Sequence, residues 1–206
     1  MRLNRQRLVQ AALDLVDEEG AEALSMRTLA ARVDRQVSSL YNHVSGRGEL
    51  IELLRARIVE DIDVSPFLPG SDQPWDEALQ AWARSYLRSF AAHPNLIRLL
   101  ATTSIRDLST YRMYDVVVAG LVRGGWAEDE VVALMRMVEA FVLGAALDIV
   151  APADLLDQES VDPTFGSIRA ALDPRHSDRF GAEAAFDLGL SSLIDGLRLR
   201  LDSASG

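Results

Sequence analysis

Apolar residues recur at spacings of three and four along nearly the whole chain, and no stretch of useful length alternates apolar with polar residues. In the first segment, for example, Leu8, Ala12 and Leu15 follow this spacing. Such a period places side chains on one face of an α-helix, whereas a half-buried strand needs a period of two. Hydrophobic residues make up 49% of the chain, enough for a substantial core. The sequence therefore predicts an all-α protein.

Capping and helix-breaking residues divide this pattern into about nine to ten helices. Asn4 is placed to cap a first helix that Gly20 ends, and Ser25 is placed to cap a short second helix over 26–32. After the turn at 33–35, a third short helix is expected over 36–43, with Val37, Leu40 and Tyr41 facing inward or partly so. The further predicted helices cover about 48–62, 75–92, 94–104, 107–123, 128–150, 165–172 and 183–201.

The clearest linker is the stretch 63–74, which is rich in proline and glycine. We expect residues 1–48 to form a three-helix head, the helix at about 48–62 to connect, and residues 63–206 to form a larger helical domain. The apolar tract from Val131 to Ala151 contains Arg136, Glu139 and Asp148, so it is interpreted as a central buried helix and not as a membrane span. Residues 151–181 are predicted to be mostly loop.

Charge is distributed unevenly between these two parts. The chain has 21 arginines, no lysine and a net charge of −10. Residues 1–48 carry seven arginines and six acidic residues, a net charge of +1, and the remainder carries −11. An acidic body would orient a near-neutral head toward DNA, which is compatible with DNA binding without requiring it. The chain lacks cysteine, which fits a reducing compartment, and we expect a cytoplasmic protein.

The last predicted helix has more apolar surface than one core contact needs. Phe186, Leu190 and Leu197 belong to one stripe, and Leu188 and Leu199 widen it. Small residues between them would let another helix approach closely; these are Gly189, Ser191, Ser192 and Gly196. Either this is a core helix of a monomer, or it packs inward and also against a partner subunit, and the second interpretation is favoured.

The short helices at the N-terminus have the spacing of a helix-turn-helix, although the pattern alone would equally suit an ordinary helical trio. The segment from Ser25 to Leu50 reads SMRTLAARVDRQVSSLYNHVSGRGEL. It resembles the head of the TetR/AcrR family of transcription regulators, and 11–20 with Ala23-Leu24 resembles that family's first helix and turn. The residues that carry the resemblance are Ser25, Arg27, Leu29, Ala30, Leu40, Tyr41, His43, Val44, Arg47 and Leu50. Asp34 and Arg35 depart from it, since the family usually has Gly or Asn followed by an apolar residue.

In a helix-turn-helix, the second helix of the pair enters the major groove and presents its N-terminal residues to base edges. The expected base-contacting residues are therefore Val37, Ser38, Ser39 and Asn42. The resemblance adds Arg27 as a guanine contact, and Tyr41, His43 and Arg47 as phosphate contacts. Arg35 is a further candidate for phosphate. Structural roles for Tyr41, as a packed ring, and for His43, as a cap, remain open.

The body resembles the tetracycline-repressor subtype, through Trp75, the stretches 84–93 and 141–148, Gly125-Trp126, and the last helix. The resemblance implies a homodimer built on a four-helix bundle, a palindromic operator, and a small-molecule effector that releases DNA by shifting a conformational equilibrium. It also implies a pocket in the body, apolar or aromatic in character. The candidate ligand-binding residues are Trp82, Tyr86, Leu100, Thr103, Val117, Met135, Glu139 and Asp148.

The metal of that subtype is not expected here. Leu100 stands where the tetracycline repressors have a magnesium-ligating histidine, and Asp148 where they have an assisting glutamate. We therefore expect neither a metal nor a cofactor. An enzyme is the first rival interpretation, but the three histidines, His43, His93 and His176, have no metal-binding or triad spacing. Two rivals stay open: a helical ligand-binding protein that does not bind DNA, and an activator of the same family.

Overall fold

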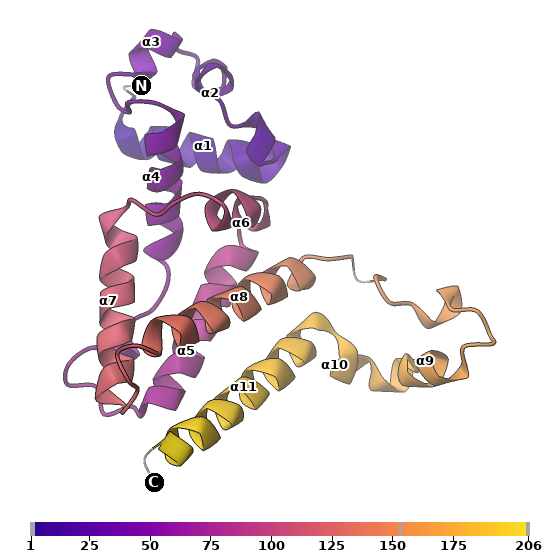
Figure 1. The fold of residues 1–206 in the computed structure, drawn as a ribbon. Coiled ribbons are helices and arrows are strands. Elements are labelled where there is room, and N and C mark those ends of the chain that lie inside the picture. The colour runs from indigo at the N-terminus through magenta and orange to yellow at the C-terminus, as the bar shows by residue number, and fades with distance from the viewer. Residues whose placement is uncertain (1–2, 153, 205–206) are drawn as a thin grey trace.

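The computed structural model describes residues 3–152 and 154–204, and every regular element within these ranges is a helix. The elements are α1 (Arg5–Glu19), η1 (Ala21–Ala23), α2 (Met26–Arg32), α3 (Val37–Leu40), α4 (Arg47–Val59), η2 (Ser65–Phe67), α5 (Trp75–Ala91), α6 (Pro94–Ala101), α7 (Leu108–Arg123), α8 (Val131–Ile149), η3 (Gln158–Ser160), α9 (Gly166–Ala171), η4 (Pro174–His176), α10 (Ser177–Phe180) and α11 (Ala182–Ala204), where η marks a 3-10 helix. A small head of α1–α3 sits at one end of a larger helical body (Figure 1). The predicted all-α fold is confirmed.

The head is built by the capping residues that the sequence predicts. The Asn4 side chain accepts a hydrogen bond from the Arg7 amide, and the Ser25 hydroxyl accepts one from the Thr28 amide. Each cap satisfies a backbone donor that has no partner within its helix. The core of the head contains Leu8, Ala12, Leu13, Leu15, Val16, Leu24, Leu29, Ala30, Leu40 and Val44.

The turn between α2 and α3 depends on Asp34, which has a φ of 51°. L-residues rarely adopt this left-handed conformation, and Asp tolerates it better than most. After the turn, the predicted helix over 36–43 is wrong in length, because α3 covers only Val37–Leu40. Residues 41–43 form tightened turns, with the His43 amide bonded to the Leu40 carbonyl at 2.9 Å. Asn42 and the following Ser45-Gly46 are poor helix formers, which explains the early end.

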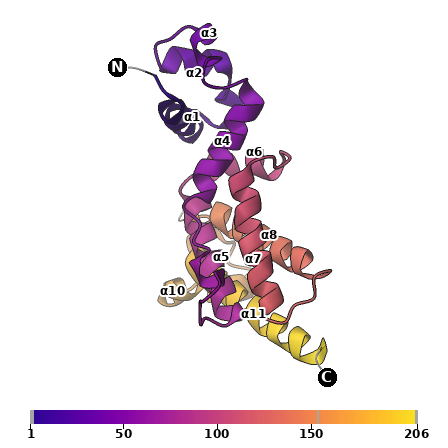
Figure 2. The same cartoon turned by 90° about the vertical axis from the view of Figure 1, so that its left-hand side faces the viewer.

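Helix α4 joins the head to the body. Leu50 and Leu54 are fully buried and Ile58 is nearly so, and the helix packs against α1 on the head side and against α5 and α7 on the body side. In the view of Figure 2, α4 runs from the head down alongside α5 and α7, and the two chain ends lie at opposite ends of the molecule. Helix α4 therefore contacts both the head and the body directly.

The body core is formed mainly by α5 and α8, which pack along each other and against α7. Although its sequence is predominantly apolar and predicts a buried helix, α8 is not buried on every side. Val138, Val142 and Ala146 are fully buried, but Met137 is 39% exposed and Leu147 is 51% exposed. The sequence pattern could not distinguish burial in the same chain from burial in a partner. No helix within the described ranges is both long enough and apolar enough to span a bilayer.

The predicted linker 63–74 is irregular but anchored. Phe67 of η2 is 2% exposed, and its ring lies against Gly120 of α7, where a Cβ atom would clash with it.

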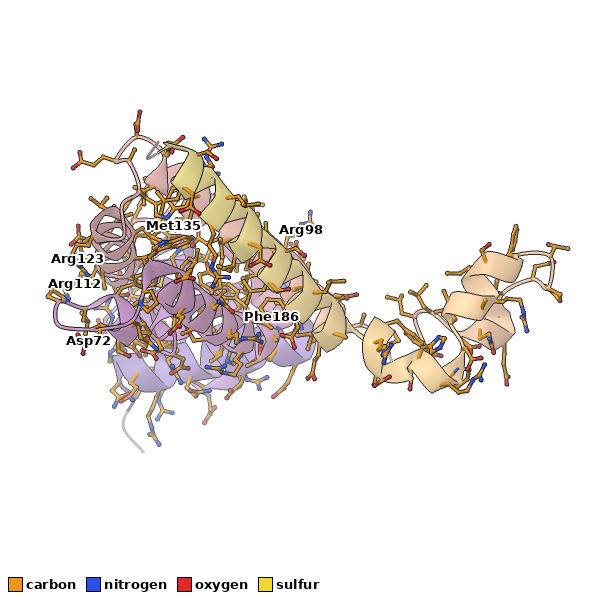
Figure 3. The ribbon with its side chains drawn as sticks, turned by 90° about the horizontal axis from the view of Figure 1, so that it is seen from below. Asp72, Arg98, Arg112, Arg123, Met135 and Phe186 are labelled. Atoms are coloured by element: carbon orange, nitrogen blue, oxygen red, sulfur yellow. The ribbon has the colours of Figure 1, made fainter. Side chains whose placement is uncertain are left out.

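At the other end of the body, residues 154–181 with α9 and α10 project away from the helical core (Figures 1 and 3). Helix α11 returns along α8 and packs against it. The absence of a side chain at Gly189 allows close contact with the Phe141 ring, because a Cβ atom on Gly189 would lie only 2.6 Å from that ring.

Candidate DNA-binding surface and ligand cavity

Helix α3 lies at the tip of the head, at the end of the molecule opposite the C-terminus (Figures 1 and 2). Leu40 and Val44 are buried and anchor it, while Ser38 and Asn42 are exposed. Tyr41 is 53% exposed, so its ring is only partly buried and remains accessible for the predicted phosphate contact. The segment is tied to the head by two apolar side chains and leaves its polar groups for contact with another molecule.

The other residues predicted to contact DNA share this end of the head. Arg27 and Arg35 are exposed, whereas Val37, Ser39 and His43 are half-buried. The Arg35 Nη1 donates a hydrogen bond to the Asp34 carbonyl at 2.6 Å. This bond ties the arginine to the backbone of the turn, at the left-handed residue itself.

Arg47, at the first position of α4, has an internal role. Its Nε donates to the carbonyl of Leu24 at 2.8 Å, which fixes the start of α4 to the segment before α2. Nearby, the Glu49 carboxylate accepts from the Ser45 amide and pairs with Arg5. These hydrogen bonds lower the pKa of Glu49. The junction between α3 and α4 is therefore held in place by hydrogen bonds and an ion pair.

The base of the head is joined to α6 of the body. The Nδ1 of His93 lies 2.8 Å from a carboxylate oxygen of Asp17, and the Asn95 amide donates to the carbonyls of Val16 and Asp17 at 3.1 and 3.0 Å. The end of α1 and the start of α6 are thus connected by polar contacts. Helix α6 therefore contacts the head, and it also lines a cavity in the body, which is described next.

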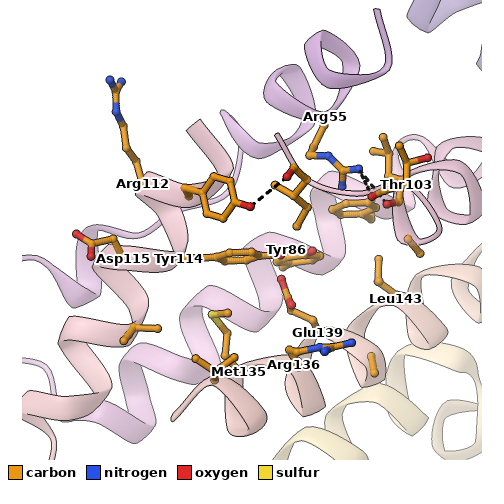
Figure 4. A pocket seen from close by; sticks show the side chains of 18 of the residues that line it. Arg55, Tyr86, Thr103, Arg112, Tyr114, Asp115, Met135, Arg136, Glu139 and Leu143 are labelled. Carbon is orange, nitrogen blue, oxygen red and sulfur yellow. Dashed lines mark hydrogen bonds between the residues drawn. The ribbon is translucent and has the colours of Figure 1, made fainter. Parts of the chain in front are cut away.

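That cavity has a volume of about 930 Å³ and lies between α4, α5, the α6–α7 segment and α8. Its wall is mostly apolar and aromatic with a few charged groups, a composition and size typical of small-molecule sites. The view in Figure 4 shows the side chains that surround it. Lining residues include Arg55, Tyr86, Phe90, Leu100, Thr103, Ile105, Tyr111, Tyr114, Met135, Arg136, Glu139 and Leu143.

Five of the eight predicted ligand-binding residues come together on this wall: Tyr86, Leu100, Thr103, Met135 and Glu139. Trp82 and Val117 do not line the cavity, because both are fully buried in the surrounding core. Asp148 is exposed near the end of α8 and does not line it either. The resemblance named residues of the body interior without separating those that line the cavity from those that contact only other side chains.

Sequence reasoning missed Arg55 and Tyr114. Arg55 belongs to the helix α4 that connects head and body, and the residue is 6% exposed. The tyrosines of α7, Tyr111 and Tyr114, are three residues apart and so share a helix face, a signal that the sequence did contain. The Tyr111 hydroxyl donates to the Ile105 carbonyl at 3.1 Å.

Arg55 and Glu52 of α4 hold the segment between α6 and α7. The Arg55 Nη2 donates to the carbonyls of Leu100 and Thr103 at 3.1 and 2.9 Å. One turn back on the same helix, the Glu52 Oε2 accepts from the amides of Arg106 and Asp107 at 2.7 and 2.8 Å. The Arg55 Nε lies 3.6 Å from the other Glu52 oxygen. One helix face therefore binds both ends of the cavity wall formed by 100–107.

Glu139 is the most buried acidic group on the cavity wall. It is 9% exposed, and its carboxylate points toward the rings of Tyr86 and Tyr114 (Figure 4). Burial raises the pKa of Glu139, although the nearby hydroxyl groups of Tyr114 and Tyr86 oppose this increase. Burial and the Glu139 charge also raise the pKa of Tyr86 and Tyr114, so both phenols stay protonated and remain donors.

The resemblance places Leu100 and Asp148 at the magnesium positions of the tetracycline repressors, and neither residue fits that ion. Leu100 is 2% exposed and has no ligating atom in its side chain. Asp148 is exposed and lies outside the cavity wall. Magnesium prefers several oxygen ligands around one point, which this pair cannot provide.

A braced helix-turn-helix head on a helical body with a ligand-sized cavity defines the class of small-molecule-responsive transcription regulators. Residues 68–201 match the family described as "Tetracyclin repressor-like, C-terminal domain". The chain belongs to this family, the tetracycline-repressor family of transcription regulators. Its members are regulators and not enzymes.

Individual proteins of known name or structure are similar to a larger part of the chain than the family model. The repressor DrrR1 of Streptomyces coeruleorubidus is 33% identical over 144 residues, 70% of this chain but only 53% of DrrR1. The class A tetracycline repressor of transposon 1721 from Escherichia coli is 29% identical over 201 residues, covering 94% of this chain and 89% of that protein. The crystal structure of ActR from Streptomyces coelicolor with actinorhodin has a TM-score of 0.76 at 28% identity and covers 95% of each chain.

Proposed function

We propose that this protein is a homodimeric repressor that binds a palindromic operator through α3 and is released by a small-molecule effector. The observation that carries the proposal is the pairing, in one chain, of an exposed α3 at the tip of the head with a cavity of about 930 Å³ in the body. The repressor names of DrrR1 and the class A protein, and the actinorhodin complex of ActR, support it.

In the proposed complex, residues 1–48 are the DNA-binding domain and 63–206 the effector-binding and dimerisation domain, with α4 between them. Val37, Ser38, Ser39 and Asn42 contact base edges, and Arg27 reaches a guanine. The contacts to phosphate come from Arg35, Tyr41, His43 and Arg47. The exposure of Tyr41 supports a role outside the core, while the Leu24 bond of Arg47 gives that residue a bracing role as well.

The proposed dimer interface is the uncovered face of α8 and α11. Leu188 is 70% exposed and Leu199 is 69% exposed on α11, and Met137 and Leu147 are exposed on α8, which packs against α11. Ser191, Ser192 and Gly196 lie on this outer side of α11, whereas Gly189 is already used against Phe141 within the chain. Exposed leucines among small residues are typical of a helix that packs on a symmetry mate.

Effector binding acts through α4 in this proposal. A ligand that displaces the wall 100–107 disturbs the contacts of Arg55 and Glu52, and these residues belong to the helix that enters the head. The ligand shifts the equilibrium only by its differential affinity for the two arrangements, and near-complete release needs about 10⁴-fold discrimination. We propose a cytoplasmic regulator without catalytic activity.

The test is a binding-site selection followed by mobility-shift assays on the DNA upstream of the protein's own gene. The proposal expects a palindromic site whose affinity falls steeply with salt, as counterions are released from phosphate. Ser39→Ala and Asn42→Ala are expected to change the preferred bases, whereas Arg35→Ala weakens all sequences alike. Equal losses on all operator variants for every one of these substitutions would contradict the assignment. Reporter expression in a deletion strain separates repression, which the proposal expects, from activation.

A further inference from the structure

We propose that the effector is an aromatic molecule with a basic nitrogen, and that the Glu139 carboxylate is its counter-ion inside the cavity. The inference rests on the proposed function, because it names the chemical class of the effector. Three observations support it: the position of one acidic group, the aromatic rings around that group, and the fact that the neighbouring arginines do not bond to its free oxygen.

Glu139 is a buried carboxyl group with an unused acceptor. Its side chain is directed into the cavity from α8, and within the described part of the chain no donor bonds to its Oε1. Leaving a buried acceptor or a buried charge without a partner costs free energy. A ligand that brings an N–H⁺ group to this oxygen recovers that free energy, and a ligand without a donor does not.

The surroundings of Glu139 suit a flat cation. Tyr86 stacks on Phe90 with ring centroids 4.8 Å apart and nearly parallel planes, and Tyr114 faces the carboxylate from α7. Met135 adds a polarizable thioether to the same wall. Aromatic faces attract cations through their quadrupole, most strongly where water is excluded. The rings and the carboxylate therefore favour the same ligand, a protonated aromatic amine.

The cationic side chains near the cavity do not use the free oxygen of Glu139. Arg55 donates to the carbonyls of Leu100 and Thr103, and its Nε lies beside Glu52. Arg136 is exposed one turn before Glu139, and Arg112 is exposed and points away from Glu139 in Figure 4. Exposed guanidinium groups are screened by water and salt, so they influence a ligand at the cavity mouth more than at its inner end.

A pH dependence follows from this arrangement. The groups that act on Glu139 are Tyr86 from α5, Tyr114 from α7, Arg55 from α4 and Arg136 on its own helix. Burial outweighs them and raises the pKa of Glu139 in the empty cavity, while a bound cation would lower it. Binding therefore releases protons, and the affinity for a cationic ligand falls as the pH decreases through the pKa of the unliganded group.

The experiment uses three acridines of the same ring size and measures their affinities by calorimetry on the full-length protein without DNA. At about pH 8, 9-aminoacridine is a cation, acridine is neutral and acridine-9-carboxylate is an anion. The variant is Glu139→Gln, which keeps the size of the side chain and removes its charge. The control is Glu128→Gln, the same chemical change at an exposed position outside the cavity. Thermal unfolding of each variant verifies that it is folded.

The proposal expects 9-aminoacridine to bind wild type about 10- to 100-fold more tightly than acridine, the range of a hydrogen bond to a charged group. Glu139→Gln removes this preference and its pH dependence, and Glu128→Gln keeps both. Equal binding of all three probes, tighter binding of the carboxylate, or a preference that survives in Glu139→Gln would overturn the inference alone. If none of the acridines bound, the inference would also be overturned, whereas the proposed function would still be tested separately by the mobility-shift assay on operator DNA.

Discussion

Replacing Arg55 by methionine removes a buried cation from the contact between α4 and the cavity wall. Methionine fills a similar volume without a charge, so the change tests the polar contacts and not the packing. The variant loses two hydrogen bonds, to the carbonyls of Leu100 and Thr103, and it leaves the Glu52 carboxylate without its cation.

The size of the effect follows from these contacts. Breaking a buried ion pair by removing one partner costs about 3–5 kcal/mol. Here Glu52 keeps two backbone donors, the amides of Arg106 and Asp107, which stabilise its charge after Arg55 is gone. We therefore expect Arg55→Met to lower the free energy of unfolding by about 2–4 kcal/mol, which is about 1 kcal/mol less than the usual range for a broken buried pair.

The assay is urea unfolding followed by circular dichroism, at equal protein concentrations because the proposed dimer makes stability depend on concentration. The control is Arg57→Met, two residues away on the same helix, where the exposed side chain pairs with Asp61 at 2.8 Å. Such a surface pair contributes about 0.3–0.5 kcal/mol. If the two variants differed from each other by less than about 1 kcal/mol, the reasoning that Arg55 and Glu52 fasten the wall to α4 would be refuted.

Three further predictions concern the turn, a close approach and the dimer. Asp34→Gly is expected to raise the thermal unfolding midpoint and Asp34→Ala to lower stability by about 1 kcal/mol, because only glycine adopts a positive φ freely; the opposite order would contradict the left-handed turn. Gly120→Ala is expected to destabilise by about 1–3 kcal/mol in urea titrations, since a Cβ there meets the aromatic ring of η2. Its control, Gly48→Ala, has open space around it and should not destabilise. Leu188→Asp combined with Leu199→Asp should give a helical monomer in sedimentation equilibrium that no longer binds the operator, and a dimer in that variant would place the interface elsewhere.

Local structure was predictable where single residues determine it. Asn4 and Ser25 have side chains that satisfy free backbone amides, so the starts of α1 and α2 follow from the sequence. Asp34 stands where the family usually has Gly or Asn, and it adopts the left-handed conformation of the turn. The length of α3 was not predictable in the same way, because its end depends on several weak preferences and not on one breaker.

The ligand cavity was only partly predictable because it is formed by packing. The resemblance identified Tyr86 and Glu139 correctly as cavity residues, yet Trp82, which it also named, is buried in the core and does not line the cavity. A helical period indicates that a side chain faces the protein interior. It does not indicate whether that side chain lines a cavity or contacts other side chains. Arg55 reaches the wall from a helix that begins in the head, and only the tertiary fold brings it close to Leu100.

The central claim is that two α3 helices, one from each subunit, enter the major groove of one DNA duplex at a fixed separation. Affinity measured as a function of the distance between the two half-sites of the selected operator tests it most directly. The account predicts tight binding of one dimer at a centre-to-centre spacing of about 10 base pairs, or a multiple of it, and a loss on the order of 10³-fold when five base pairs are inserted. Equal affinity at both spacings, or equally tight binding of a monomer to a single half-site, would contradict it.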